Sequence, residues 1–436
     1  MPNLNPNSTN YVHSYEPNTN DLHHAMDYNA LGEPIIRVAL NPASADAFGR
    51  LRVAEPFTLF DSFHRYQDNS KVSEQLTGGA TSAHDPNSSS IVLTVPTTSG
   101  ASAIRETSRV FPYQPGKSLQ FMITFVMAAP KANLRQRAGL FDVNNGIFLE
   151  QDGNTVYLVQ RSSSANGTPV DRRVAQQDWN IDRFDGTGHS TVALDLTKAQ
   201  IFFSDIEWLG VGSVRCGFVV NGEYIPVHTF HWANTEPATT TYMGTAILPG
   251  RAEIVNTGTT ASSSTYRDIC FSVISEGGYE LRGRPRSVGH PLATPKVISS
   301  GNGMVPLLSI RLKADRLGAV VLPKNFSISV TAAAKFQYEI ISSAVTTGGT
   351  WVSAGTNSSV EYNLNPTSYT NGTVFETGYI ISSNQASVSP NLSDFPFAYQ
   401  LERNTFVPTA YEFVIAMTTD GNNQSVYASI NWEELT

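Results

Sequence analysis

The residues best suited to chemistry form an acidic stretch, Asp-Trp-Asn-Ile-Asp-Arg-Phe-Asp-Gly, at positions 178–186. Oxygen-bearing side chains occupy its alternate positions Asp178, Asn180 and Asp182, as they do at the start of a helix-loop-helix calcium site. Such a loop also needs glycine at position 183 and glutamate at position 189, where this chain has arginine and histidine. The stretch therefore favours a solvated loop over a calcium site. We expect no metal ion and no other cofactor.

Hydrolysis is the other chemistry that these carboxylates suggest. Two of the three aspartates in this stretch, Asp178, Asp182 and Asp185, could form a glycosidase pair. Sequence spacing alone cannot place two carboxylates at catalytic separation. Serine is abundant, yet no Gly-x-Ser-x-Gly elbow is present. Gly210 and Gly212 lack the lysine and the strand-to-helix context of a phosphate loop, and they indicate a tight turn instead. We therefore predict no catalytic residue and expect a protein that is not an enzyme.

Two pairs of histidines remain as possible metal ligands. His228 and His231 lie three positions apart in a sequence typical of a strand, so their imidazoles should face opposite sides of the sheet. His23 and His24 are adjacent, and adjacent side chains diverge. The sequence favours core or interface roles for the first pair and a solvated loop for the second.

Three tryptophans are candidates for a different kind of site, because an exposed indole can stack on a sugar ring. They are Trp179, Trp208 and Trp232. A shallow, exposed aromatic groove would favour binding of glycans. Burial of the same rings in a core would favour a scaffold.

The elements that must position these residues are strands. Alternating or β-branched runs occur at 90–96, 119–127, 147–160, 214–230 and 269–274. Asn221-Gly222 predicts a type I′ hairpin, and Asp152-Gly153 predicts a second turn. The nearest approach to a helix is a short stretch at 194–200. We therefore predict an all-β fold of two β-sandwich regions, jelly-roll or immunoglobulin-like, with an extended N-terminal arm.

The predicted boundaries divide the chain into four parts. Residues 1–45 are rich in Asn, Pro, Ser and His without sustained periodicity, and they predict the extended arm. A large sandwich domain is expected at 46–285. The following basic and Pro-rich stretch, which contains Arg286 and Lys296, predicts a linker at 286–303. A second sandwich domain is expected at 304–436.

The composition limits the classes of partner. Charged residues are only 15% of the 436 residues, and the net charge is −8, so the chain offers no general attraction for phosphate and we expect no nucleic-acid partner. No secretory signal and no apolar run of about 18 residues is visible, so no membrane insertion is expected. Cys216 and Cys270 both stand in predicted strands. Two buried thiols are favoured over a disulfide.

One segment carries a resemblance to a known family. Ala47-Phe-Gly-Arg-Leu-Arg-Val53, followed by Thr58-Leu-Phe-Asp-Ser62, resembles an N-terminal signature of uncharacterised virion structural proteins of tailed bacteriophages of the cyanophage and marine-phage type. The resemblance continues through Gly139-Leu-Phe-Asp142 and Trp208 to Arg215, and it covers most of residues 40–280. It implies a place in the virion, in the tail, baseplate, fibre or capsid decoration, and it brings no catalytic residues.

The same segment is too apolar for a free linker. We expect its apolar side chains to cover either this chain's own sandwich or a neighbouring molecule, with an ordinary strand as the alternative. The interface candidates are Phe48, Leu51, Val53, Phe57, Leu59 and Phe60. The leading hypothesis is a virion structural protein that associates with itself, possibly as a trimer, and with other virion proteins. The alternative is a glycan-binding protein for host attachment.

Overall fold

The computed structural model describes residues 55–69, 71–235, 240–384, 386–388, 392 and 399–435, together with the backbone of three short N-terminal strands. These strands, β1 (Val12–Tyr15), β2 (Leu22–Tyr28) and β3 (Pro34–Ile35), form a small antiparallel sheet within a separate unit, Met1–Ala54. Most of the predicted arm lies outside the described residues. The interface candidates Phe48, Leu51 and Val53 lie outside them too.

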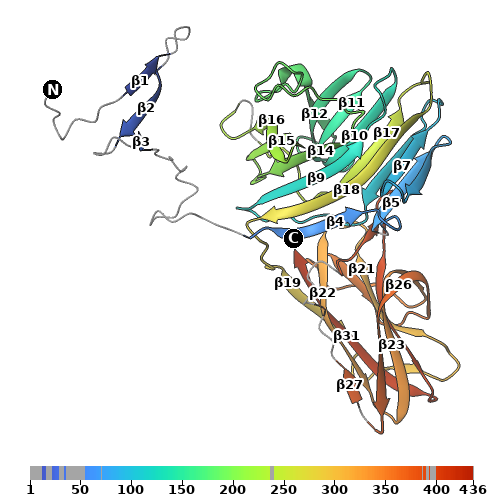
Figure 1. Ribbon diagram of the computed structural model, residues 1–436. Helices are drawn as coiled ribbons and strands as arrows, with labels where there is room; N and C mark the ends of the chain where they lie inside the picture. Colours follow the sequence, from blue (N-terminus) through green and yellow to red (C-terminus); the bar gives the residue numbers. More distant parts are fainter. Residues whose placement is uncertain are drawn as a thin grey trace. The chain divides into compact units, whose positions relative to one another are not determined.

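The second unit, Glu55–Thr436, is all-β, which confirms the predicted fold class. Every strand pairing within the described residues is antiparallel (Figure 1). The described residues contain no helix long and apolar enough to cross a membrane. Within the part of the chain that the structure describes, the one helical element is a single 3₁₀ turn, η2 (Gln176–Asp178). The stretch at 194–200, the nearest approach to a helix in the sequence, contains a turn, in which Asp195 accepts a hydrogen bond from the Thr197 backbone N–H.

The first sandwich consists of a seven-stranded and an eight-stranded sheet. The seven-stranded sheet has the order β13 (Val170–Ala175), β12 (Thr155–Ser162), β11 (Gly146–Asp152), β10 (Leu134–Phe141), β17 (Gly250–Asn256), β8 (Ser102–Thr107), β5 (Val72–Thr77). The eight-stranded sheet has the order β16 (Glu223–His231), β15 (Ser213–Val220), β14 (Gln200–Ile206), β9 (Ser118–Val126), β18 (Ser264–Glu276), β7 (Ser90–Val95), β6 (Thr81–Asp85), and β4 (Phe57–Phe63) also pairs with β18.

The second sandwich consists of a five-stranded and a six-stranded sheet. The five-stranded sheet has the order β19 (Arg284–Gly289), β31 (Gln424–Leu435), β22 (Val320–Val330), β27 (Ala386–Val388), and β20 (Lys296–Ile298) also pairs with β31. The six-stranded sheet has the order β24 (Val352–Ser353), β25 (Val360–Asn363), β21 (Val305–Leu312), β30 (Glu412–Thr419), β23 (Ala334–Thr347), β26 (Ser368–Ser382). A separate ribbon joins β28 (Arg403–Asn404) to β29 (Thr409–Ala410).

The predicted linker at 286–303 is not a free segment. Its basic residues lie on β19 and β20, and both strands pair with β31, the last strand of the chain. The sequence missed this pairing because the partner strand is more than a hundred residues away, and Pro285 and Gly289 suggested a break. An edge position tolerates a proline, since no ladder hydrogen bond is needed there.

The core of the first sandwich follows from strand alternation. Along β9, Leu119, Phe121, Ile123 and Phe125 are buried, while the residues between them are half-exposed. Val320 and Leu322 of β22 belong to the same apolar cluster, so the second sandwich contributes to the first core.

Polar contacts join the two sandwiches as well. Arg109 forms an ion pair with Glu402 at 2.7 Å, and the Gln400 side-chain amide donates to the carbonyl of Val110 at 3.0 Å. Arg403 reaches Glu106 at 3.5 Å. These contacts join the end of β8, in the first sandwich, to residues 400–403.

Two local predictions are confirmed. At the hairpin between β15 and β16, Asn221 and Gly222 have φ angles of 54° and 84°, and Val220 pairs with Glu223. At the turn between β11 and β12, Gly153 has a φ angle of 59° and Asp152 pairs with Thr155.

Candidate functional site

The acidic stretch at 178–186 forms a closed turn. Asp182 is buried, and its two carboxylate oxygens accept hydrogen bonds from the backbone N–H groups of Phe184 at 2.8 Å and Ser190 at 2.6 Å. The Asp185 carboxylate accepts from Thr187 instead. Across the described residues, no three His, Cys, Asp or Glu side chains are grouped so that they could hold a metal ion.

The histidines of β16 face opposite sides, as their spacing predicts. His228 is buried, its Nδ1 accepts a hydrogen bond from the Asn180 backbone N–H at 3.2 Å, and burial lowers its pKa to about 4. His231 is exposed and lies 3.0 Å from the hydroxyl of Ser213. His228 therefore has a structural role, holding the 178–186 stretch against the sheet.

The three candidate tryptophans differ in exposure. Trp179 and Trp232 are buried in the first core at 4% and 8% exposure, and Trp232 stacks on Tyr242 with ring centroids 3.7 Å apart. Neither ring is available to a sugar. Trp208 is half-buried and lines a pocket, so of the three candidates only its ring stays partly accessible.

This pocket, which we call the Trp208 pocket, has a volume of about 360 Å³. Its walls come from the chain before β9, the turn between β14 and β15, the segment before β17, the segment after β18 and the end of β31. The lining residues are Pro112, Tyr113, Gln114, Pro115, Trp208, Gly244, Thr245, Ala246, Ile247, Tyr279, Glu280, Arg282 and Leu435. Both sandwiches thus contribute to it.

Local contacts fix the aromatic wall of the pocket. The Trp208 indole N–H donates to the carbonyl of Met243 at 3.2 Å, and the Tyr113 ring meets Trp208 edge to face with centroids 6.1 Å apart. The Tyr113 hydroxyl accepts a hydrogen bond from the Leu209 backbone N–H at 3.3 Å. Gly210, with a φ angle of 79°, closes the turn that presents Trp208.

Polar groups form the rim of the pocket. The Gln114 amide donates to the carbonyl of Glu280 at 2.9 Å and accepts from its backbone N–H at 3.1 Å. The Glu280 carboxylate is half-exposed, lies 3.9 Å from Lys117 Nζ and pairs with Arg282. The pocket therefore combines apolar faces with hydrogen-bonding groups at its edge.

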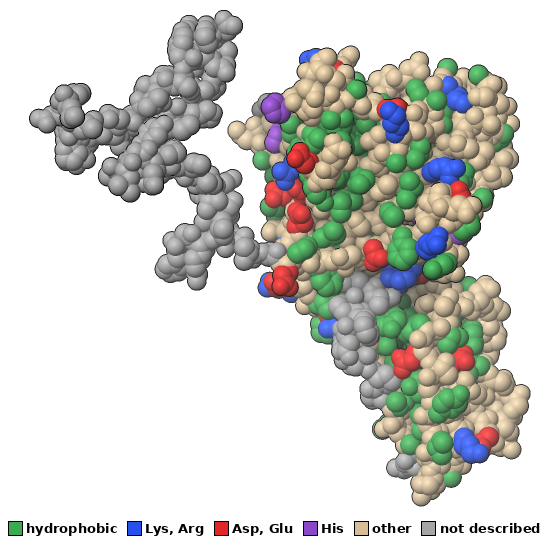
Figure 2. Space-filling model, viewed as in Figure 1, with side chains coloured by type: hydrophobic (Ala, Val, Ile, Leu, Met, Phe, Trp, Pro, Cys, Tyr) green, Lys and Arg blue, Asp and Glu red, His purple; other side chains and the backbone are tan. Residues whose placement is uncertain are grey.

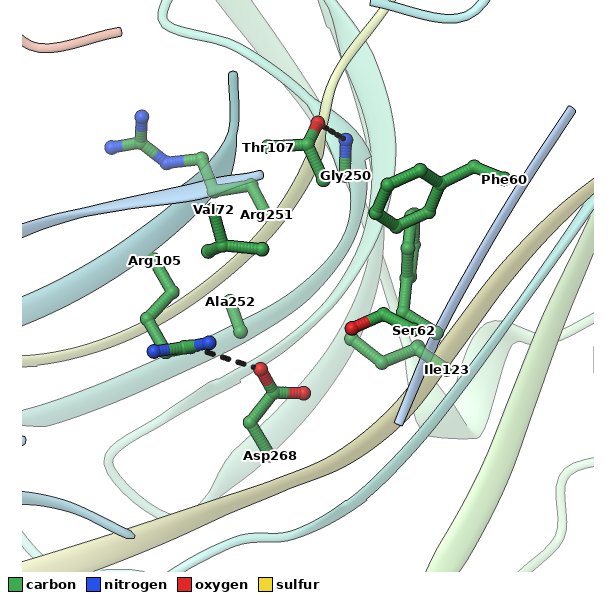
Figure 3. Close-up of a pocket in the computed structure, with 11 residues that line it drawn as sticks. Phe60, Ser62, Val72, Arg105, Thr107, Ile123, Gly250, Arg251, Ala252 and Asp268 are labelled. Carbon is green, nitrogen blue, oxygen red and sulfur yellow. Dashed lines mark hydrogen bonds and ion pairs between the residues drawn. The ribbon is translucent and has the colours of Figure 1, made fainter. Parts of the chain in front are cut away.

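A second, much smaller cavity lies between the sheets of the first sandwich (Figure 3). Its volume is about 20 Å³, enough for about one water molecule. Arg105 on its wall is 1% exposed and donates to Asp268 at 3.1 Å and to Asp68 at 2.8 Å. Thr107 accepts from the Gly250 backbone N–H at 3.1 Å on another wall. We assign this cavity to the structural core, because the polar side chains on its walls form hydrogen bonds within the protein.

The face of the seven-stranded sheet that points away from the first core carries two neighbouring glutamates, which could be considered as a pair of hydrolytic acids. Glu150 and Glu253 both pair with Arg137, at 2.5 and 3.0 Å, and both side chains are nearly inaccessible, at 0% and 4% exposure. Burial alone would raise the pKa of Glu253, but Arg251 and Arg137 hold it below its ordinary value. Ion pairing and burial leave these carboxylates without access to a substrate.

The remaining predicted residues have structural positions. Leu59 and Phe60, on β4, are buried in the first core, so they cover this chain's own sandwich. Phe57 is half-buried against Tyr279, with ring centroids 6.3 Å apart. Cys216 and Cys270 are both free thiols, as predicted, but Cys270 is exposed on the outward side of β18.

Comparison with known proteins identifies no family. No family model matches the sequence, and no curated protein matches it. Solved structures with some likeness include a Bacillus licheniformis β-glucanase (10% identity, 50% of this chain and 97% of that chain, TM-score 0.31). Others are the CBM2 module of the Lactobacillus casei BL23 phage J-1 evolved Dit (7%, 52% and 100%, 0.34) and a Bauhinia forficata lectin in complex with GalNAc (12%, 51% and 100%, 0.29). Values this low carry no information on function.

The sequence missed most of the Trp208 pocket. Tyr113 and Gln114 were not predicted to act together with Tyr279, because Tyr279 lies more than 160 residues further along the chain. One available signal was the Pro112-Tyr-Gln-Pro115 run, an aromatic residue between two prolines in a connection between strands. Prolines in such a loop stiffen the backbone that presents the ring.

Proposed function

We propose that this protein is a non-enzymatic, glycan-binding component of a tailed-phage virion, and that the Trp208 pocket is its binding site. The observation that carries the proposal is the pocket itself, with a partly exposed indole, two tyrosines and a polar rim around about 360 Å³. A volume of this size matches the lower end of small-molecule sites and accommodates one or two sugar rings.

The wall chemistry suits a sugar. The C–H face of a pyranose packs on an aromatic ring, and its hydroxyls need donors and acceptors at the edge of the contact. Trp208 and Tyr113 supply rings, while Glu280 and Arg282 supply charged hydrogen-bonding groups at the rim. Thr245 adds a hydroxyl to the lining.

Binding without turnover is supported by the state of the carboxylates. Glycoside hydrolysis uses two carboxyl groups that flank the bond to be broken. Among the lining residues of the Trp208 pocket only Glu280 is acidic, and it is paired with Arg282 and Lys117. The proposal that the protein is part of a virion rests on the resemblance of its N-terminal segment to phage virion proteins. Mass spectrometry of purified particles tests it, because the chain should be detected in them.

The test of the pocket is a glycan array followed by titration calorimetry on the strongest ligand. Trp208→Ala should weaken binding at least about tenfold, equivalent to about 1.4 kcal/mol. Trp208→Phe keeps a ring but loses the indole N–H bond to Met243, so its affinity for the glycan should lie between those of the wild type and Trp208→Ala. Tyr379→Ala is the matched control, because Tyr379 is a 70% exposed aromatic residue of the second sandwich.

Equal binding by wild type and Trp208→Ala would refute the site. If no glycan binds to the wild type, the glycan-binding function is refuted as well. Chain-length analysis of the bound glycan after prolonged incubation tests whether the protein hydrolyses its ligand. Shortened products would contradict the proposal of binding without turnover.

A further inference from the structure

The outward faces of the two sheets in the first sandwich differ in charge. Over β9, β14 and β18, on the side that faces the viewer in Figure 2, charged side chains are few and scattered. The outward face of the seven-stranded sheet instead carries a network of arginines and carboxylates. Its arginines are Arg135, Arg137, Arg161, Arg173 and Arg251, and its carboxylates are those of Glu106, Glu150, Asp152, Asp171 and Glu253.

Arg135 is the member of this network that has no counterion. Leu134 and Ala138 of β10 point into the first core, so Arg135 and Arg137 point outward. Each carboxylate of the network forms an ion pair with an arginine other than Arg135. The half-buried Arg135 guanidinium forms no ion pair or hydrogen bond with any residue that the structure describes, and its Nε is shielded from solvent. Because arginine stays protonated, this cation lacks an anion.

The carboxylates nearest to Arg135 are held by other arginines. Asp152 lies directly opposite Arg135 on β11, but its carboxylate is already 2.7 Å from another guanidinium. Glu150 and Glu253, two residues along on the neighbouring strands, both pair with Arg137. Burial and the charge of Arg137 lower the pKa of Arg135 in spite of these three carboxylates. An anion from outside the chain would offset this cost.

We propose that Arg135 binds the carboxylate of an acidic sugar residue in a glycan. The terminal nitrogens of a guanidinium present N–H donors side by side, which match the two oxygens of a carboxylate. A carboxylate carries one negative charge, so the nearby Asp152, whose side chain is 35% exposed, repels it less than it would repel a doubly charged phosphate. None of the described residues that line the Trp208 pocket belongs to this face, so the two sites are separate.

The surroundings of Arg135 suit a sugar better than a protein. Thr155 and Thr77 stand in line with Arg135 across the sheet, and both are exposed, so their hydroxyl groups are accessible to a glycan. The apolar side chains closest in register, Val255 and Ile104, are half-buried. A protein interface needs a core of large apolar or aromatic side chains, which these two do not provide.

The experiment titrates the full chain by calorimetry with oligomers of galacturonate, glucuronate and mannuronate. Each oligomer is compared with its methyl ester, which keeps the sugar rings but removes the charge. The wild type should bind at least one acidic oligomer about tenfold or more tightly than its ester, and added salt should reduce this preference. Arg135→Met should abolish the preference and leave binding of the ester unchanged. Arg135→Lys, which keeps the charge but loses the planar fork, should retain part of it.

Arg172→Met is the matched control. Arg172 is an exposed arginine of β13 that points to the opposite side of the same sheet, so this variant should keep the wild-type preference. The urea midpoint of the unliganded protein should be no lower for Arg135→Met than for Arg172→Met, because Arg135 has no ion pair to lose. A lower midpoint would overturn the proposal, since it would show that a group of this chain holds the guanidinium.

The binding data give three further ways to overturn the proposal. They are a wild type that prefers none of the acidic oligomers, an Arg135→Met variant that keeps the preference, and an Arg172→Met variant that loses it. The proposal rests on glycan binding but not on the Trp208 pocket, so Trp208→Ala should leave the ratio of acid to ester affinity unchanged. Loss of the preference in Trp208→Ala would place the acidic group in that pocket and contradict the role of Arg135.

Discussion

Replacement of Arg105 by methionine should destabilise the first sandwich more than any exposed charge change. Arg105 is 1% exposed and donates to Asp268 and Asp68, and it also pairs with Glu74. Methionine fills much of the same volume but leaves three carboxylates around a small cavity with no cation among them. Removing one partner from a fully buried ionic cluster costs about 3–5 kcal/mol, because the charges that remain are uncompensated. Asp68 and Glu74 are 37% and 26% exposed and stay partly hydrated, so we expect the lower end of this range, about 3 kcal/mol.

The assay is urea denaturation followed by circular dichroism, with the free energy of unfolding extrapolated to water. Arg267→Met is the matched control. Arg267 makes a 3.0 Å ion pair with Asp85, but the Arg267 side chain is 41% exposed, against 1% for Arg105, so its loss should leave the free energy of unfolding nearly unchanged. Equal costs for the two variants would refute the reasoning.

A pH series adds a second test of the same cluster. Burial opposes ionisation of Asp68, but hydrogen bonds from Arg105 hold its pKa below the ordinary 3.8. A carboxyl group with a lowered folded-state pKa contributes stability that is present above its unfolded pKa and is lost as the pH falls through the folded value. The difference between wild type and Arg105→Met should therefore shrink below about pH 4. A constant difference down to pH 2 would contradict the assignment.

Three further predictions concern single sites. Gly222→Val should cost about 1–2 kcal/mol in the free energy of unfolding, because valine is strained at a φ angle of 84°, and an unchanged urea midpoint would contradict this. Burial lowers the pKa of His228 to about 4, so its protonation favours the unfolded state, and stability should fall between pH 6.5 and 4. Burial lowers the pKa values of His64 and His290 as well, so His228→Asn should lose part of this dependence in thermal melts, and an unchanged dependence would contradict the assignment. Cys270 should react with a thiol reagent in the folded protein, whereas Cys216, which is buried and has its pKa raised to about 12, should react only after unfolding.

Local sequence patterns determined the strands and turns of this protein. The alternation along β9 and the Asn221-Gly222 turn could be read directly, because the two-residue period and a positive φ angle are properties of neighbouring residues. The all-β class follows from the same signals. The opposed directions of His228 and His231 also follow, since three positions along a strand reverse the side of the sheet.

Only the tertiary structure decided which aromatic residues are exposed. Trp179, Trp208 and Trp232 look equivalent in the sequence, yet two lie in the core and one lines a pocket. Burial depends on which strands from distant parts of the chain pack over a residue. No local pattern contains that information.

The same limit explains the two largest differences from expectation. The segment predicted as a linker became β19 and β20 because β31, at the far end of the chain, offered ladder partners. The Trp208 pocket brings together Tyr113, Tyr279 and Leu435, each more than 150 residues from the next along the chain. Strand identity is a local property of the sequence, whereas strand partners and pockets follow from long-range contacts that only the folded chain makes.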